Sequence, residues 1–553
     1  MPAARLATAL AALLAAVLVG SASAKEGAVA SAPRGLHGFL LRPSEPLTHT
    51  FSRTPAFAWS PVRGASCYEF ELATSRTFDG SSVVWTNVAR GAASGASCAR
   101  NRIKIPAVSL NLVLPWFTGK PYALYARVRA ITPRGASRWS RPYGFNMRWE
   151  EQPVPMPARP GLVRWTPVEG ATAYDVWFTG PWFSKTVRTH TNVADQREHY
   201  SFHLDEEWWR LVKWRVRAVR QVVGKVPNGL PAVSYGPWSH EHTVTNPGWS
   251  SGRIRLGQAL SDRVSAPGTA GPHELMPALT FSGDQGLDGK AYRLFRFYAA
   301  TDRDCVNVVF TGSVVGSPAY APRVTGPLAL PGSAEALDKA FAEALEDAEG
   351  EGPKEFSAEG MPLTPNEAAG RESPSLRKID LPDLDPRTTR YYWTVVPVLI
   401  RFADGEEGGA FEYWDVETPQ DACQAGRVGV FGRESKPVIT RAGSPFVSGL
   451  SPKGRLLAQA GRRPTVYSTP LVAWRPVVGA TGYEVQWSRT VYPWRTVGRR
   501  LTVATSAVLD LRPGRWYYRV RGLNAAQVGT RAMAWSAPVE LRIVRPTFAV
   551  ARG

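Results

Sequence analysis

The sequence is poor in the residues and motifs that mark catalytic and metal sites. Its 553 residues include four cysteines, eight histidines and six methionines. No phosphate-binding loop, HExxH pair or CxxC spacing occurs in it. Aspartate and glutamate are common, but none lies in a motif that would place two carboxylates across a substrate. We therefore expect a non-enzymatic protein with no catalytic residue and no cofactor; the alternative is an enzyme whose site lies in the irregular region 251–436.

Long apolar segments are equally scarce, and the one that occurs is at the N-terminus. Arg5 is followed by an uncharged apolar run from Leu6 to Val19 and by Ala22-Ser23-Ala24, the small-residue pattern of a cleavage site. The run is shorter than the roughly 20 residues of a membrane-spanning helix. We interpret residues 1–24 as a signal peptide, with retention as an anchor as the alternative. After cleavage the protein would not span a membrane and would be secreted, extracellular or associated with the cell surface.

Metal-ligand patterns are weak as well. Five histidines fall in one stretch of the chain, and two of them, His240 and His242, would share a face of a strand as metal ligands need. Solvent-facing histidines are commoner on edge strands, so no metal site is predicted. The acidic spacings that could suggest calcium, in Asp284 with Asp288 and in Asp380, Asp383 and Asp385, lack a regular six-oxygen loop, and we expect these residues to form turns.

Tryptophan, proline and glycine are abundant, and they recur in an ordered way. The chain has 20 Trp, 46 Pro and 50 Gly. The phrase WxPVxGAxxY occurs three times, from Trp59 to Tyr68, from Trp165 to Tyr174 and from Trp474 to Tyr483. A strand ending in a buried Trp, a Pro that stops the ladder, a Gly-Ala turn and a Tyr that opens the next strand explain the pattern. Period-two alternation follows each Tyr, which predicts strands with one wet face.

A second phrase follows each copy and pairs arginines with a tryptophan. Each is a strand with two arginines at alternate positions, followed by a Trp-Ser pair; the residues are Arg127, Arg129 and Trp139, then Arg215, Arg217 and Trp238, then Arg519, Arg521 and Trp535. The apolar residues of these strands alternate inward, so the arginines must point outward. We predict that each Trp lies flat between its two arginines in a cation–π ladder that stabilises the fold and is not available to a ligand.

The two phrases together resemble the fibronectin type III fold. This resemblance implies all-β, tandem fibronectin type III-like (immunoglobulin-like) β-sandwiches, which serve as spacers and binding modules and bring no catalytic residue with them. It covers 33–150, 158–246 and 446–546, while 251–436 is a degenerate copy. That copy has an insertion at 332–375, predicted to hold one amphipathic helix and a disordered acidic loop. We expect the four sandwiches in a row, each with its own core, and a semi-rigid proline-rich spacer at 151–157.

The four cysteines allow three pairings. Pairing Cys67 with Cys98 and Cys305 with Cys423 keeps each bridge within one repeat, and an exported chain would be oxidised. We therefore predict two disulfides, the second of which ties the two halves of the third domain together.

Charge and exposed aromatics give the last clue to partners. The net charge is +20, although 333–375 alone contributes −8, so the rest of the chain is strongly basic and would attract polyanions. Five tryptophans outside the repeats could form platforms for sugar rings or a protein: Trp182, Trp208, Trp209, Trp249 and Trp494. We expect a secreted binding or scaffolding protein with an unknown protein or glycan ligand or an anionic cell-surface polymer, and no specific nucleic acid. A carbohydrate-binding accessory of polysaccharide degradation is the alternative.

Overall fold

The computed structural model describes most of the four predicted domains and leaves the ends and several connections outside the description. The described residues are 31–40, 48–88, 98, 103–104, 106–117, 122–156, 161–181, 183–189, 192–196, 212–221, 230–231, 233–244, 250–257, 278–312, 314–321, 390–402, 411–432, 439–443, 465–467, 471–475, 480, 482–509, 511–524, 531–532 and 535–544. The signal peptide, the insertion at 332–375 and the residues His190, His199, His203, Trp182, Trp208, Trp209, Trp249, Asp380, Asp383 and Asp385 lie outside them.

The first sandwich packs a three-stranded sheet against a six-stranded one. The sheet orders are β1-β3-β6 and β2-β9-β7-β4-β5, with β8 paired to β7. The strands are β1 (His37–Phe39), β2 (Thr50–Phe51), β3 (Ala56–Ala58), β4 (Cys67–Ala73), β5 (Val83–Thr86), β6 (Ala107–Ser109), β7 (Leu124–Thr132), β8 (Gly135–Ala136) and β9 (Tyr143–Met147). In chain order these are strands A, B and E of one sheet and C′, C, F and G of the other, the arrangement of fibronectin type III and immunoglobulin domains.

The second sandwich repeats this arrangement. Its sheets are β10-β11-β14 and β13-β12-β15-β16, with β17 also paired to β15. The strands are β10 (Pro155–Met156), β11 (Leu162–Trp165), β12 (Ala173–Gly180), β13 (Phe183–Thr189), β14 (Val193–Asp195), β15 (Lys213–Gln221), β16 (Val233–Trp238) and β17 (His242–Thr243).

The third sandwich keeps the two sheets in spite of its divergent sequence. The sheets are β18-β19-β22 and β21-β20-β23-β24, with β25 paired to β23. The elements are β18 (Arg255–Leu256), β19 (Leu279–Ser282), β20 (Leu294–Ala300), β21 (Val308–Thr311), β22 (Ala319–Tyr320), β23 (Arg390–Phe402), β24 (Phe411–Asp415), α5 (Pro419–Gln424) and β25 (Gly429–Gly432). Thr418 and Asp421 form a capping box at the start of α5. No helix in the described part of the chain is both long and apolar enough to span a membrane.

The fourth sandwich matches the first, including a short strand that runs parallel to the last one. Its sheets are β26-β28-β31 and β27-β34-β32-β29-β30, with β33 paired to β32. The strands are β26 (Ile439–Gly443), β27 (Thr465–Tyr467), β28 (Leu471–Trp474), β29 (Gly482–Ser488), β30 (Thr496–Thr502), β31 (Ser506–Val508), β32 (Gly514–Asn524), β33 (Arg531–Ala532) and β34 (Val539–Val544).

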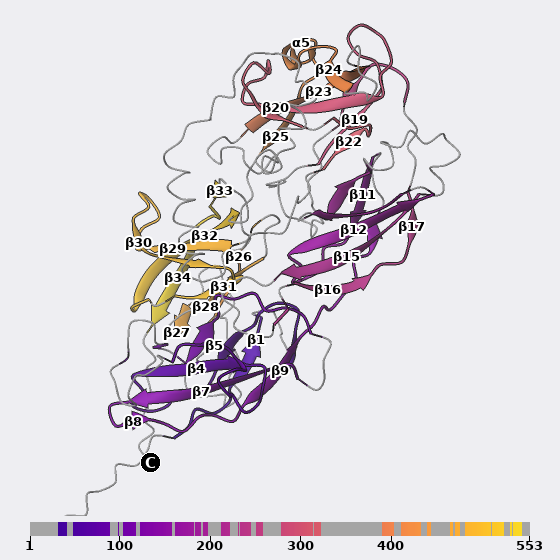
Figure 1. Ribbon diagram of the computed structural model, residues 1–553. Coiled ribbons are helices and arrows are strands. Elements are labelled where there is room, and N and C mark those ends of the chain that lie inside the picture. The colour runs from indigo at the N-terminus through magenta and orange to yellow at the C-terminus, as the bar shows by residue number, and fades with distance from the viewer. Residues whose placement is uncertain are drawn as a thin grey trace, which may run out of the picture.

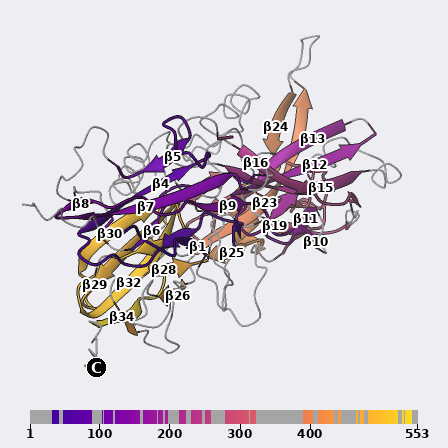
Figure 2. The same ribbon diagram turned by 90° about the horizontal axis from the view of Figure 1, so that it is seen from below.

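The sandwiches do not form a row, because the chain folds back on itself. In Figure 1 the first sandwich lies at the bottom, the second at the right, the third at the top and the fourth at the left, beside the first. The three-stranded sheets of the first and fourth sandwiches meet, and Figure 2 shows β6 and β1 next to β28. Outer side chains of the two sheets form one buried cluster: Phe39, Ala56, Ala58, Ala107 and Ala473, with Val508. The Ser109 hydroxyl donates to the carbonyl of Ser506 at 2.9 Å.

The second and third sandwiches meet through the same kind of sheet. Leu162 and Val193 form a buried cluster with Ala278, Ala319 and Ala321. The backbone N–H of Ala321 donates to the Asp195 carboxylate at 2.9 Å. Gly161 has φ +75°, and a Cβ there would lie 2.9 Å from that of Ala319, so the close approach of the two domains requires glycine. In both pairs small side chains let the sheets approach closely.

The first two sandwiches also share a core, so the expectation of separate cores and of a spacer that holds these domains apart was wrong. One cluster of buried residues runs from Leu40 to Val244. Trp116 of the first domain packs edge-to-face on Trp149, with ring centroids 6.0 Å apart, and the backbone N–H of Trp116 donates to the Ser234 hydroxyl of the second domain at 2.8 Å. The predicted spacer contains β10, which pairs with β11 as the first strand of the second sandwich. The proline pattern therefore belongs to an edge strand, where a missing N–H is tolerated.

Two arginines fasten this junction. Arg220 is 3 % exposed and donates to the carbonyls of Leu114 and Gly170 and to the Thr54 hydroxyl. Burial lowers the pKa of its guanidinium to about 9. Arg53 contacts three parts of the chain: Glu169 of the second domain at 2.7 Å, the carbonyl of Leu40 at 3.2 Å, and Thr505 of the fourth domain. Folding back thus brings polar groups from three domains together.

Candidate functional site: the arginine–tryptophan ladders

The repeated Trp and Tyr residues build the inside of each sandwich. Trp59, Trp165 and Trp474 are at most 2 % exposed. Each packs edge-to-face on the Tyr of its phrase, Tyr68, Tyr174 or Tyr483, with ring centroids 5.2, 5.4 and 5.3 Å apart. The Tyr68 hydroxyl accepts from the N–H of Val62 at 3.0 Å, and the Tyr174 hydroxyl accepts from Val168 at 2.7 Å. The tyrosine therefore closes the turn that the Pro-Val-x-Gly segment begins.

The serine of each Trp-Ser pair fixes the tryptophan over strand F. Ser140 donates its N–H to the carbonyl of Val128 at 2.8 Å, and its hydroxyl accepts from the N–H of Val128 at 3.1 Å. Ser239 makes the same two bonds to Val216, and Ser536 makes them to Val520. The serine thus makes both backbone hydrogen bonds that a residue of a neighbouring strand would make to strand F. This holds the preceding Trp at the same position in each domain. Sequence reasoning found the pair but missed this role of the hydroxyl.

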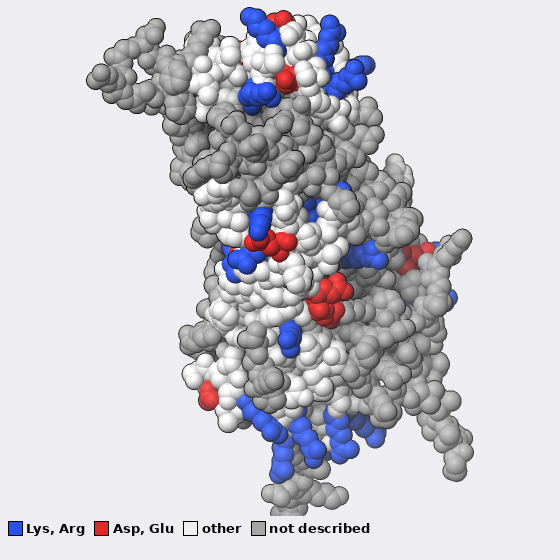
Figure 3. All heavy atoms as spheres, turned by 90° about the vertical axis from the view of Figure 1, so that its right-hand side faces the viewer, with Lys and Arg blue, Asp and Glu red and all other residues white. Residues whose placement is uncertain are grey.

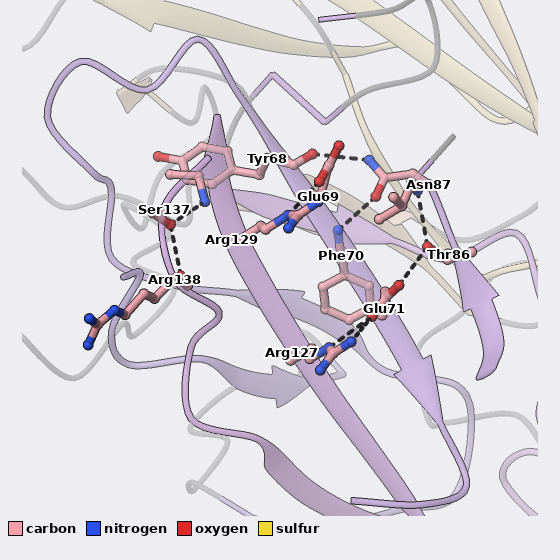
Figure 4. Close-up of polar contacts among 12 residues, drawn as sticks. Tyr68, Glu69, Phe70, Glu71, Thr86, Asn87, Arg127, Arg129, Ser137 and Arg138 are labelled. Carbon is pink, nitrogen blue, oxygen red and sulfur yellow. Dashed lines mark hydrogen bonds and ion pairs between the residues drawn. The ribbon is translucent and has the colours of Figure 1, made fainter. Parts of the chain in front are cut away.

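The first ladder combines stacking with two ion pairs. The guanidinium carbons of Arg127 and Arg129 lie 4.3 and 4.6 Å from the ring centroid of Trp139. On the neighbouring strand β4, Glu71 accepts from Arg127 and Glu69 from Arg129, both at 2.6 Å. Figure 4 shows each arginine reaching across to its own glutamate. Both charges of this ladder are therefore balanced within the sheet.

A side chain completes the hydrogen bonding beside the first ladder. The Asn87 amide oxygen accepts from the N–H of Phe70 at 2.7 Å, and its NH₂ donates to the carbonyl of Tyr68 at 3.1 Å. Figure 4 shows Asn87 occupying this position at the side of β4. Beyond the end of β5, the Asn87 side chain makes the hydrogen bonds to β4 that a neighbouring strand would otherwise make.

The second ladder has more arginines than acids. Arg215 and Arg217 lie 4.9 and 4.6 Å from Trp238, and Arg215 is covered on its other side by Trp177 at 4.4 Å. Asp175, which is 2 % exposed, pairs with both Arg217 and Arg188. The Nε of Arg215 is buried without a hydrogen-bond partner. Two indole faces thus take the place of a carboxylate at Arg215.

The fourth-domain ladder follows the second. Arg519 and Arg521 lie 4.2 and 4.5 Å from Trp535, and Trp494 covers Arg519 at 4.2 Å. Arg521 pairs with Glu484 at 2.7 Å, while Arg519 donates to the Gln486 amide oxygen at 2.9 Å. Burial, and then the charge of Arg521, lower the pKa of Arg519. Trp494, which the sequence suggested as an exposed platform, is therefore part of the ladder.

The third domain has a buried polar cluster instead of a ladder. Arg296 donates to the Asp415 carboxylate at 2.8 Å, and the Tyr298 hydroxyl also contacts this carboxylate. Burial raises the pKa of Asp415. Arg427 pairs with Glu417 close by in the chain, and both side chains are 7 % exposed. These groups join β20 to the segment around β24 and α5, so they stabilise the divergent copy from inside.

Both disulfides are present with the predicted pairing. Cys67 is bonded to Cys98, and Cys305 is bonded to Cys423, with Cα atoms 6.0 Å apart in each. Cys423 lies on α5 and Cys305 follows β20, so the second bridge connects segments on either side of the insertion. Within the described residues no group of three or more His, Cys, Asp or Glu side chains is arranged to hold a metal. His242 packs 5.7 Å from the ring of Trp214, and His240 lies just before it at the surface.

The aspartates considered for calcium serve in turns. Asp284 is 5 % exposed and accepts from the N–H of Gly252 at 3.0 Å. Asp288 accepts from the N–H of Lys290 at 3.0 Å and from the Tyr292 hydroxyl at 2.6 Å, and these bonds lower its pKa. Their carboxylates are therefore engaged by the protein itself.

The ladders contain partners that the sequence could have revealed. Glu69, Glu71, Asp175, Glu484 and Gln486 alternate on strand C just after each repeated Tyr, which places them on the outer face opposite the arginines. The period-two pattern was visible, but the pairing register that sets each acid beside its arginine was not. Trp177 belongs to the same series, because it lies on β12 two residues after Asp175 and directly opposite Arg215, whereas Phe78 comes from the connection between β4 and β5 and left no signal near the arginines.

Comparisons with known proteins add nothing to the sheet topology described above. No protein-family model and no curated protein matches the sequence. Among solved structures, the chain is similar to the FN1–FN3 domains of chicken CNTN1, with 11 % sequence identity over 71 % of this chain and 99 % of that one and a TM-score of 0.14. The observed sheet orders place the chain among fibronectin type III-like, immunoglobulin-like sandwiches.

Proposed function

We propose that this chain is a secreted, non-enzymatic binding or scaffolding protein of the extracellular space or cell surface. The sandwich fold supports a binding or scaffolding role in general. One observation supports a rigid scaffold: the three-stranded sheets are buried in pairs, first against fourth and second against third. The larger sheets, three of which carry a ladder, therefore remain as the faces that a partner can reach.

The two disulfides and the N-terminal apolar segment support export. A disulfide between residues 118 apart in sequence persists in an oxidising compartment. The test is to express the full chain in its producing cells and to sequence the N-terminus of protein recovered from the medium. A new N-terminus near Lys25 supports secretion, whereas uncleaved protein confined to the cytosol overturns it.

Solution scattering tests the scaffold itself. A compact chain of this length has a radius of gyration of about 24 Å, and four sandwiches in a row would give a clearly larger value. A value near that of a row would show that the paired sheets do not hold the protein together, and the scaffold proposal would fail.

A carbohydrate-binding accessory protein is the second candidate. Tyr492 is 93 % exposed at the tip of a hairpin, which suits stacking on a sugar ring. Binding to a polysaccharide that a co-secreted enzyme degrades, measured by pull-down on the insoluble polymer, would favour this candidate.

A further inference from the structure

Four arginines converge at one end of the fourth sandwich, well separated along β32 from the ladder. Arg515 and Arg542 are direct cross-strand neighbours on β32 and β34. Arg489 donates to the carbonyl of Arg515 at 3.0 Å and lies 3.6 Å from the Trp516 ring, and Trp516 in turn donates to the carbonyl of Arg512 at 2.7 Å. We name Arg489, Arg512, Arg515 and Arg542 the terminal arginine cluster.

The charge around this cluster is strongly unbalanced. The described segments 482–509, 511–524 and 535–544 contain nine arginines and two glutamates. Glu484 pairs with Arg521 of the ladder, and Glu540 lies 3.3 Å from Arg515. Like charges placed directly opposite on neighbouring strands destabilise a sheet. The Arg515 side chain is nevertheless 64 % exposed and available to an anion.

An exposed aromatic hairpin lies beside the cluster. Three residues after Arg489, Tyr492 is 93 % exposed, and Val491 and Val497 are 46 % and 58 % exposed. The hairpin is braced from within: Trp494 stacks on Arg519, and its N–H donates to the Thr496 hydroxyl at 3.0 Å. The Thr490 hydroxyl donates to the carbonyl of Pro493 at 2.9 Å. Tyr492 is thus presented by a supported turn and is not covered by its own domain.

We propose that the terminal arginine cluster and Tyr492 form a binding site for an anionic polysaccharide. Sulfate or carboxylate groups would pair with guanidinium groups, and the tyrosine ring would pack on the apolar face of a sugar ring. The ladder arginines of the same domain do not compete for this ligand, because Arg519 and Arg521 stack on Trp535 and also bond to Gln486 and Glu484. This inference rests on the proposed extracellular binding role and assigns that role a ligand class and a place.

The test measures binding of the full chain to heparin, a sulfated polysaccharide, at two salt concentrations. Replacing Arg512, Arg515 and Arg542 together with Gln should weaken binding at least tenfold at 0.15 M salt. It should also reduce the slope of log K against log salt by about 2, since three ionic contacts are lost. Tyr492→Ala should weaken binding roughly fivefold with an unchanged slope, because a stacking contact carries no charge.

A control of equal charge separates a defined site from general basicity. Basic side chains also line the lower end of the molecule in Figure 3, over the first domain. Arg134, Arg138 and Arg141 of the first domain are exposed, and they follow the ladder strand in sequence. Replacing these three with Gln removes the same charge and should leave heparin affinity within twofold. An equal loss in the two triple variants would overturn the site. All variants are at exposed positions, and unchanged thermal unfolding verifies their fold.

Further probes decide the ligand class. Dextran sulfate should bind and neutral dextran should not, and a duplex DNA of equal charge should bind more weakly than heparin and be insensitive to Tyr492→Ala. Equal DNA binding with the same tyrosine dependence would refute the polysaccharide assignment. If the secreted protein binds none of these probes, the inference fails while the extracellular role stands. If the protein is not exported, the proposed function fails whatever the result of the heparin-binding measurement.

Discussion

The two sheets of each sandwich carry different side chains on their outer faces, although both alternate with the same period. In the first sandwich the three-stranded sheet presents Ala56, Ala58 and Ala107, and the larger sheet presents arginines, acids and Trp139. The alanine face is buried against another domain, while the arginine face remains outside. The sheet whose outer face is apolar therefore docks, and the sheet whose outer face is charged is displayed.

The largest effect is expected where a charge is placed on the docking face. Ala58 is 1 % exposed and lies in the cluster with Ala473 of the fourth domain. Ala58→Glu should cost about 3 to 5 kcal/mol of unfolding free energy, because a carboxylate would be buried without a partner. Denaturant unfolding and the radius of gyration measure the loss and the separation of the two domains.

The displayed face supplies the control for that substitution. Val497→Glu introduces the same group at a position that is 58 % exposed, and its effect should stay within about 0.5 kcal/mol. If both variants unfold at the same denaturant concentration, the first and fourth domains are not docked in solution.

A smaller effect is expected at the junction of the first, second and fourth domains, where Arg53 lies. Arg53→Gln removes the ion pair to Glu169 and the contact with Thr505, and it should cost about 1.5 to 3 kcal/mol, the range for hydrogen bonds to charged groups. A double-mutant cycle with Glu169→Gln measures the coupling. Arg63→Gln, at an exposed turn of the first domain, is the control. A coupling energy of zero would show that this pair does not join the domains.

Replacing the ladder arginines with lysine should lower the free energy of unfolding by roughly 1 to 2 kcal/mol. Lysine keeps the charge but cannot stack as a plane. Arg521→Lys removes a stack on Trp535 and leaves Arg519, which braces the Tyr492 hairpin through Trp494, in place. It should therefore destabilise the fourth domain in thermal unfolding and leave heparin affinity unchanged. Arg495→Lys with Arg499→Lys, both exposed in the same domain, should change neither quantity. Reduced heparin affinity with unchanged stability would mean that the ladder binds the ligand.

The smallest effect is a loss of stability at acid pH in the turn around Asp79, between β4 and β5 of the larger sheet. Asp79 accepts from the hydroxyls of Thr77 and Ser81, and these bonds lower its pKa to about 2. A depressed carboxyl pKa stabilises the folded turn above the unfolded value of 3.8, and that contribution disappears as the pH falls toward about 2. The Asp79 carboxyl resonance in NMR should titrate in that lower range. A midpoint near 4 would show that the turn does not hold the charge.

The repeated phrases made much of the fold readable in advance. WxPVxGAxxY identifies strand B, a turn and strand C, because a buried Trp, a ladder-stopping Pro and alternating residues each leave a local signal. The same alternation indicated that Arg127, Arg215 and Arg519 face outward. The third domain has no copy of the phrase, and its strands β19, β20 and β23 consist of apolar runs instead. β26 begins at Ile439, ahead of the predicted start of the fourth domain at residue 446. The boundary was placed too late because this edge strand has no repeated phrase near it.

The sequence by itself determined the sandwiches and the residues of the ladders, because these depend on neighbours one strand away and on a period of two. Only the tertiary structure decided that the first domain packs on the fourth, that Arg53 joins three domains, and that Arg489, Arg515 and Arg542 gather at one end. The physical reason is that such contacts join residues up to 452 positions apart. Small or charged side chains mediate them, and the same residue types occur throughout the surface without marking an interface.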